Sequence, residues 1–115
     1  MVDEVIVLKP GAKLTGLQPQ TVLAICIADG VFSRRGIECV VTSGNDGAHK
    51  EGSFHYRGLA ADFRLKHIIS PEERKRVVAE IRSNCGTLGT QYDVLHEGAG
   101  TDNEHVHIEF DPKEK

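Results

Sequence analysis

The sequence lacks tryptophan, a CxxC cysteine pair, a dense basic cluster and a long apolar run. Its 17 acidic and 14 basic residues give a formal net charge of −3, which argues against a nucleic-acid or anionic-membrane partner. The apolar run at 22–28 is too short to cross a membrane, so we expect no membrane insertion. The N-terminus is acidic and its apolar stretch at 5–8 is short, so we expect no signal peptide and synthesis in the cytoplasm.

Hydrophobic and cysteine content indicate the kind of domain. The chain has 115 residues, of which 39% are hydrophobic, and this suffices for one domain with its own core. We expect a monomer. We also expect the C-terminal residues 111–115 to be frayed. The cysteines are odd in number and two lie in apolar runs, which predicts free, buried thiols in a reducing compartment. They are Cys26, Cys39 and Cys85.

The pattern of helix and strand signals predicts an α+β domain, with two helices packed on one face of a small, mostly antiparallel sheet. Ser70 suits the N-cap of the second helix and Gly86 its stop. The two helices are expected at 17–35 and from 70 to about 84. The spacing of apolar residues predicts that one side of the first helix is buried. The side chains expected on that side are Leu23, Ile27, Val31, Ala24 and Ala28. Strands are expected at 5–8, 38–42, 59–65, 91–96 and 104–110.

Histidines lie in or beside two polar loops, at 43–53 and 97–103, and on the last predicted strand. His105 and His107 alternate on that strand, so both imidazoles point to the same face, with Glu109 beyond them. Paired histidines are poor core material because each ring nitrogen needs a partner, and a metal would supply one. Cross-strand packing also explains such a pair.

His55 and Asp62 are the other candidates for a metal site. On a straight strand they would face opposite sides, but the intervening Gly58 allows a bend or bulge that brings them together. Asp62 lies among apolar residues, and a buried carboxylate needs a compensating charge. That charge is either a divalent cation or one of the neighbouring arginines, Arg57 and Arg64.

Two imidazoles and one carboxylate would give zinc three protein ligands and leave a fourth position for water. The predicted ligands are His55, Asp62 and His107. A nearby carboxylate would then act as general base. Glu104, three residues before the last ligand, is the first candidate, and Glu97 and Asp102 are the next. In a regular strand Glu104 would face away from the metal, so this role requires it to precede the strand or to lie at a bulge.

The segment 53–62 (SFHYRGLAAD) resembles the SxHxxGxAxD motif of the D-alanyl-D-alanine carboxypeptidase and L-alanyl-D-glutamate endopeptidase family of metallopeptidases. The segment 104–107 (EHVH) resembles the ExxH motif of the same family. The resemblance implies zinc-dependent hydrolysis of an amide bond in peptidoglycan stem peptides, with Glu104 as general base. Members of this family without export signals occur in bacteriophages, which implies action on the cell wall after release through holin pores or from a virion.

The resemblance also implies residues that bind substrate. Ser53 matches a position whose hydroxyl holds a substrate carboxylate, and His105 would stabilise an oxyanion or orient a ligand. Family members carry an arginine shortly after the strand that precedes the first motif, but here the loop at 44–47 reads GNDG. Several residues could replace that arginine: Lys50, Arg57, His49, Arg34 and Arg35.

A second hypothesis is a zinc-stabilised binding module without peptidase activity. The segment 42–62 also resembles the zinc-site segment of the hedgehog signalling domain, including its HY dipeptide. Asp46 and Glu51 could belong to a calcium site, but acidic residues are too few there to favour one. Retention of Glu104 favours the hydrolase.

Overall fold

The computed structural model describes residues 6–44 and 53–112 and confirms the predicted α+β class. The elements in this part of the chain are β1 Val7–Leu8, α1 Pro19–Arg34, β2 Val40–Ser43, the short 3-10 helix η1 Phe54–Arg57, β3 Ala60–Arg64, α2 Pro71–Leu88, β4 Tyr92–Glu97 and β5 His105–Phe110. Most of the predicted loop at 43–53 and the end of the predicted frayed tail lie outside the described residues. Neither described helix has the length and apolar character needed to cross a bilayer.

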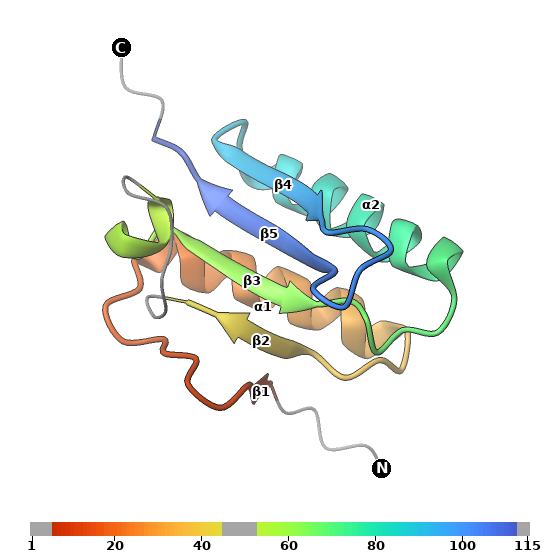
Figure 1. Cartoon of the computed structure of the whole chain (residues 1–115). Coiled ribbons are helices and arrows are strands. Elements are labelled where there is room, and N and C mark those ends of the chain that lie inside the picture. The colour runs from red at the N-terminus through yellow and green to blue at the C-terminus, as the bar shows by residue number, and fades with distance from the viewer. Residues whose placement is uncertain (1–5, 45–52, 113–115) are drawn as a thin grey trace.

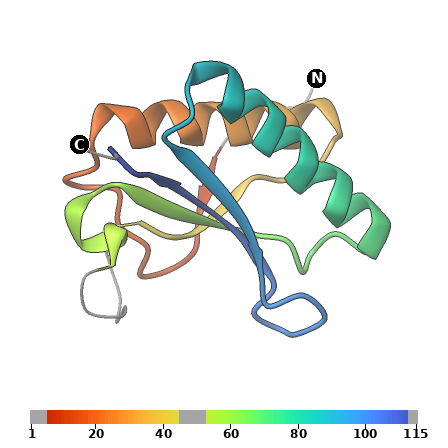
Figure 2. The same cartoon turned by 90° about the horizontal axis from the view of Figure 1, so that it is seen from above.

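The five described strands form one sheet in the order β1-β2-β3-β5-β4, in which only β1 and β2 run parallel. Figure 1 and Figure 2 show both helices on the same face of this sheet, as predicted. Val106 and Ile108 of β5 are buried toward the helices. The alternating residues of that strand, His105, His107 and Glu109, therefore lie on the other face, which we call the open face.

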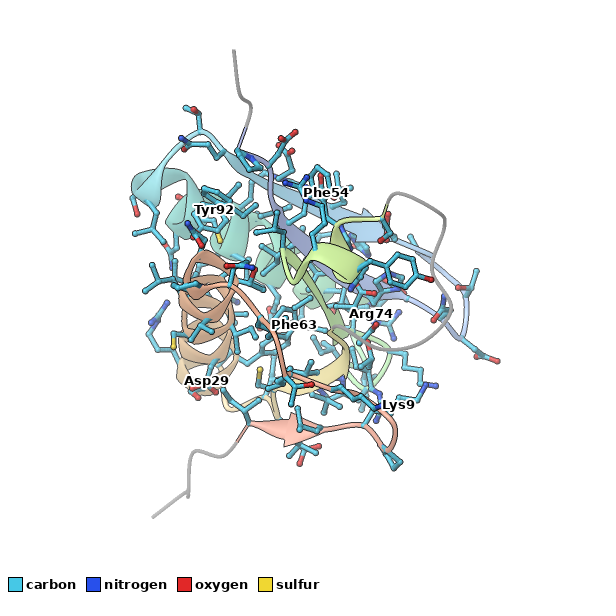
Figure 3. The ribbon with its side chains drawn as sticks, turned by 90° about the vertical axis from the view of Figure 1, so that its left-hand side faces the viewer. Lys9, Asp29, Phe54, Phe63, Arg74 and Tyr92 are labelled. Atoms are coloured by element: carbon cyan, nitrogen blue, oxygen red, sulfur yellow. The ribbon has the colours of Figure 1, made fainter. Side chains whose placement is uncertain are left out.

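The hydrophobic core lies between the helices and the sheet, and Phe63 of β3 is fully buried in it (Figure 3). The predicted inward stripe of α1 is correct at Val31 but wrong at Leu23, which is 52% exposed. Thr21 determines which side of α1 faces the sheet. Its hydroxyl donates a hydrogen bond of 2.7 Å to the carbonyl of Gly58 and so holds that side of the helix against the chain before β3. The buried residues of α1 are Thr21, Ala24, Ile25, Ala28, Val31 and Phe32.

Helix α2 begins as predicted but ends later. The hydroxyl of Ser70 accepts a hydrogen bond of 3.2 Å from the backbone N–H of Glu73, which confirms Ser70 as the N-cap. The predicted stop at Gly86 is wrong, because the helix continues to Leu88. Cys85 is fully buried in the core. This packing offsets the cost of about 1 kcal/mol for a glycine inside a helix.

All three cysteines are free, but they do not share one environment. Cys39 and Cys85 are buried as predicted, and burial raises the pKa of their thiols to about 12 and about 11. Cys26 is exposed, so the prediction of burial is wrong there. The reason is that it lies on the outward side of α1, away from the buried residues of that helix.

Candidate metal centre

The chain reaches the candidate site through a tight turn between η1 and β3. Ser53 caps η1, because its hydroxyl accepts a hydrogen bond of 3.2 Å from the backbone N–H of His55. Gly58 ends η1 with a φ of 69°, in the left-handed region that favours glycine. A Cβ at this position would also collide with the carbonyl oxygen of Gly16. The predicted bend at Gly58 is confirmed, and its form is a helix cap that directs the chain into the strand carrying Asp62.

The structure brings the three predicted ligands together on the open face. Asp62 of β3 and His107 of β5 are direct neighbours in the antiparallel pairing, and Nδ1 of His107 lies 2.7 Å from Oδ1 of Asp62. Nε2 of His55 lies 3.3 Å from Oδ2 of the same carboxylate. One ligand atom from each of these residues falls within 4.8 Å of the others, so the group can hold a metal ion.

Hydrogen bonds on the far side of each imidazole determine which nitrogen faces Asp62. Nδ1 of His55 lies 2.7 Å from the carbonyl oxygen of Gly44, and Nε2 of His107 lies 2.7 Å from Oε1 of Glu109. Carbonyl and carboxylate oxygens only accept, so these nitrogens carry protons. The remaining nitrogens both point at Asp62. Histidines that bind metals are oriented in the same way, each donating its second N–H to a carbonyl or carboxylate.

The charges of this group are strongly coupled. Burial alone would raise the pKa of Asp62, but hydrogen bonds from His107 and His55 outweigh it and hold that pKa well below the usual range. Burial alone would lower the pKa of His107, but hydrogen bonds to Asp62 and Glu109 raise it to about 9. Without a metal, Asp62 and His107 therefore form an ion pair, and a bound cation would take the place of the proton between them.

The structure does not place Glu104 with this group. Glu104 is 5% exposed, and its carboxylate accepts hydrogen bonds from Arg74 of α2 at 2.8 Å and from His96 of β4 at 2.6 Å. The backbone N–H of Gly100 donates a third, at 3.2 Å. Burial alone would raise the pKa of Glu104, but the bonds from His96 and Gly100 and the charge of Arg74 lower it. Arg74 belongs to the helix layer, so this carboxylate points away from the open face.

A different carboxylate, Glu97, lies beside the ligand group. It ends β4 on the open face, and its Oε1 is 2.9 Å from Nε2 of His105. Nδ1 of His105 in turn donates to the carbonyl of Asn103 at 2.7 Å. Glu97 lines a cleft of about 500 Å³ with the three ligands. Its other lining residues are Lys9, Thr42, Ser43, Ser53, Asn103 and His105.

The residues predicted to bind substrate have different positions. Ser53 and His105 line the cleft. Arg57 stacks its guanidinium over the ring of Phe54, 5.4 Å from the centroid, and does not line the cleft. Lys50 lies outside the described residues.

Three further residues were expected as possible replacements for the family arginine. His49 lies outside the described residues, like the acidic pair expected for a calcium site. Arg34 and Arg35 both form ion pairs with Glu80 of α2, at 2.8 Å and 2.7 Å. Their guanidinium groups are therefore in the helix layer, on the other side of the sheet from the candidate ligands.

Some residues near the ligands received no role from the sequence. Glu109 contacts His107, and Lys9 lines the cleft. Alternation on β5 did place Glu109 on the face of the ligands, although it assigned no role to this carboxylate. No comparable signal exists for Lys9, which precedes the sheet's central strands by a long stretch of chain.

No protein-family model and no curated protein matches the chain.

Proposed function

We propose that this protein is a zinc-dependent hydrolase that cleaves an amide bond in peptidoglycan stem peptides. The observation that carries the proposal is the orientation of the two imidazoles, each of which turns one ring nitrogen toward the carboxylate of Asp62. Two nitrogen ligands and one oxygen ligand suit zinc and leave a fourth position for water. The resemblance of segments 53–62 and 104–107 to cell-wall metallopeptidases supports the choice of substrate.

Nε2 of His55, the carboxylate of Asp62 and Nδ1 of His107 would hold the metal. Zinc bound there would supply Lewis-acid activation of a water molecule and of the scissile carbonyl. Gly44 and Glu109 keep the ligating rings in the required tautomers through the hydrogen bonds described above.

Glu97 is our candidate for the general base, in place of Glu104. Its carboxylate lies at the cleft and its side chain is 46% exposed, so it can accept a proton from water and deliver it to the leaving amine. Glu104 is a poor base because three donors already occupy its carboxylate. His105, whose Nδ1 donates to the carbonyl of Asn103 and whose Nε2 contacts Glu97, would orient the carboxylate of Glu97 in the cleft.

Two measurements test the proposal together. Metal analysis of the purified chain should find about one zinc per molecule, and His55→Ala, Asp62→Ala and His107→Ala should each lose it. His67→Gln is the matched control, because His67 bonds the carbonyl of Glu38 and does not line the cleft.

Digestion of purified peptidoglycan, followed by mass spectrometry of the products, should then show one cleaved amide bond. Undiminished zinc in all three ligand variants would contradict the ligand set. Zinc without any cleavage would contradict the hydrolase and favour the zinc-stabilised binding module.

A further inference from the structure

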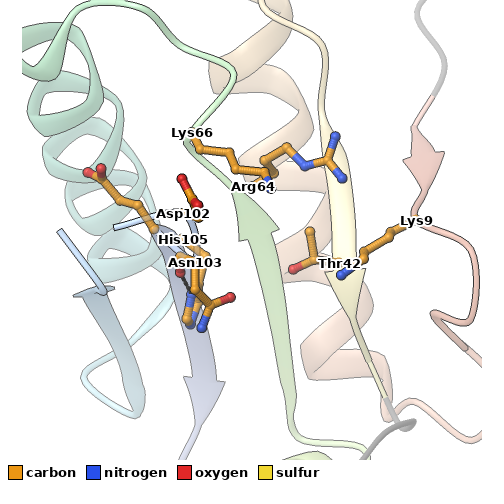
Figure 4. A pocket seen from close by; sticks show the side chains of 8 residues that line it. Lys9, Thr42, Arg64, Lys66, Asp102, Asn103 and His105 are labelled. Atoms are coloured by element: carbon orange, nitrogen blue, oxygen red, sulfur yellow. Dashed lines mark hydrogen bonds between the residues drawn. The ribbon is translucent and has the colours of Figure 1, made fainter. Parts of the chain in front are cut away.

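A second pocket continues the cleft along the open face, away from the candidate ligands. The two share Lys9, Thr42, Asn103 and His105 in their linings. Beyond these residues the pocket is lined by Arg64, Lys66, Asp102 and Glu104. Figure 4 shows Lys9, Thr42 and Arg64 grouped at the β2–β3 side of this pocket, with Asp102, Asn103 and His105 at the β5 side.

The basic residues of this pocket lack the ion pairs that hold four other arginines of the described chain, Arg34, Arg35, Arg74 and Arg76. Within the described part of the chain, Lys9, Arg64 and Lys66 form no ion pair. Nε of Arg64 is buried and has no hydrogen-bond acceptor there. Buried donors are nearly always satisfied in folded proteins, so this donor points to a missing acceptor.

The acidic residues of the pocket do not supply that acceptor. The carboxylate of Glu104 is held by Arg74 and His96, as described above. Asp102 is exposed to solvent and lies on the opposite side of the pocket from Arg64 (Figure 4). The β2–β3 side of the pocket therefore presents positive charge, together with the hydroxyl of Thr42.

The distance between the basic residues and the candidate metal centre determines which part of a bound peptide could reach them. Arg64 and Asp62 alternate on β3 and so lie about 7 Å apart along the strand. That is the length of about two residues of an extended peptide. A group that reaches the basic residues would therefore be one or two residues away from an amide bond at the ligands.

We propose that Lys9, Arg64 and Lys66 form a subsite for a carboxylate of the peptide that is cleaved. This inference rests on the proposed function. Guanidinium and ammonium groups bind carboxylates through charge-assisted hydrogen bonds, and a neutral carboxamide loses that attraction. Stem peptides with L-lysine at the third position carry two such groups, the C-terminal carboxylate of D-alanine and the α-carboxylate of γ-linked D-glutamate.

The test compares acid and amide forms of two peptides by isothermal titration calorimetry on the full chain, with a chelator present so that no peptide is cut. The first pair is Nα-acetyl-L-Lys-D-Ala-D-Ala and its C-terminal carboxamide. The second is L-Ala-γ-D-Glu-L-Lys-amide and its D-isoglutamine form. In one pair the acid should bind about tenfold more tightly, and that pair identifies the carboxylate.

Variants test whether the basic residues of the subsite cause the preference for the acid over the amide. Lys9 and Lys66 are exposed, so Lys9→Gln/Lys66→Gln should fold normally and reduce the preference to less than about threefold. Arg64→Gln should do the same, with thermal unfolding as a check of its fold. Lys75→Gln, an exposed position on α2, is the matched control and should retain the full preference.

Equal affinity for the acid and the amide in both pairs would overturn the subsite. It would also be overturned if Lys9→Gln/Lys66→Gln and Arg64→Gln kept the full preference for the acid over the amide. Because binding is measured without turnover, absence of hydrolysis does not affect this result. Hydrolysis by a chain that shows no acid preference would overturn the subsite and leave the proposed function intact.

Discussion

Glu97 and Glu104 lie at the two ends of the loop between β4 and β5, yet their environments are opposite. Glu97 is on the open face, with a side chain that is 46% exposed and bonded to His105. Glu104 has a side chain that is 4% exposed and is held against Arg74 and His96. The comparison teaches that the face of the sheet, rather than distance along the sequence, decides which carboxylate lies beside the candidate ligands. In the proposed mechanism Glu97 transfers the proton, and Glu104 holds the loop through its bonds to Arg74 and His96.

The largest expected effect is on catalysis by Glu97→Gln. The amide keeps the shape and can still bond His105, but it cannot accept a proton, so turnover on peptidoglycan should fall by about 10²- to 10⁴-fold. Zinc content and unfolding midpoint should not change. The assay is the initial rate of peptide release, with the exposed Glu72→Gln of α2 as control. A rate near that of the wild type would remove Glu97 from the mechanism.

The second expected effect is on stability, in Glu104→Gln. The substitution leaves Arg74, which is mostly buried, without its anionic partner, and should lower the free energy of unfolding by about 2–4 kcal/mol. Urea unfolding measures this, and Glu72→Gln again serves as control. The folded fraction should retain zinc and turnover. Wild-type stability combined with lost turnover would reverse the roles that we assign to the two glutamates.

The third expected effect is on metal affinity, in Glu109→Gln. Glu109 bonds Nε2 of His107, and loss of such a supporting carboxylate weakens metal binding by about 10- to 100-fold. Competition with a chromogenic chelator gives the dissociation constant. Glu38→Gln is a suitable control because the side chain of Glu38 does not line the cleft. Unchanged affinity would mean that Glu109 does not orient the ligand.

The candidate ligand group could be predicted because the two motifs contain its residues and local geometry sets the faces on which they lie. Alternation on β5 places His105, His107 and Glu109 on one face, and Gly58 is the residue that a tight turn to β3 requires. The partner of Glu104 could not be predicted in this way. Arg74 lies on α2, and only the packing of that helix against the sheet brings the two side chains together.

The errors in the helices have the same physical origin. Propensity predicted a stop at Gly86, but burial of Cys85 carries α2 further. Apolar periodicity placed Leu23 inward, but the bond from Thr21 to Gly58 sets a different rotation of α1. Likewise, Lys9 reaches the cleft only because β1 pairs with β2 at the edge of the sheet. Contacts between distant segments decide each of these features.

The smallest expected effect is a difference between the two clusters in the pH dependence of stability. The pKa of Glu104 is lowered from 4.5, so its contribution to stability is present above that value and is lost as the pH falls through the lowered pKa. The pKa of His107 is raised from 6.5 to about 9. Its contribution in metal-free protein is complete below 6.5 and is lost as the pH rises toward 9.

Unfolding midpoints measured from about pH 4 to about pH 9.5 should therefore decline at both ends in metal-free protein. Zinc replaces the proton between His107 and Asp62, so zinc-loaded protein should show no decline between about pH 6.5 and 9 beyond that of the surface groups. The lowered pKa of Asp62 also contributes to the acid decline, so Glu104→Gln should weaken that decline without removing it, and should leave the alkaline one. A cation on Nδ1 of His107 leaves no proton there to lose at alkaline pH. If the unfolding midpoints of zinc-loaded and metal-free protein fell equally at alkaline pH, the metal would therefore not displace the proton of His107.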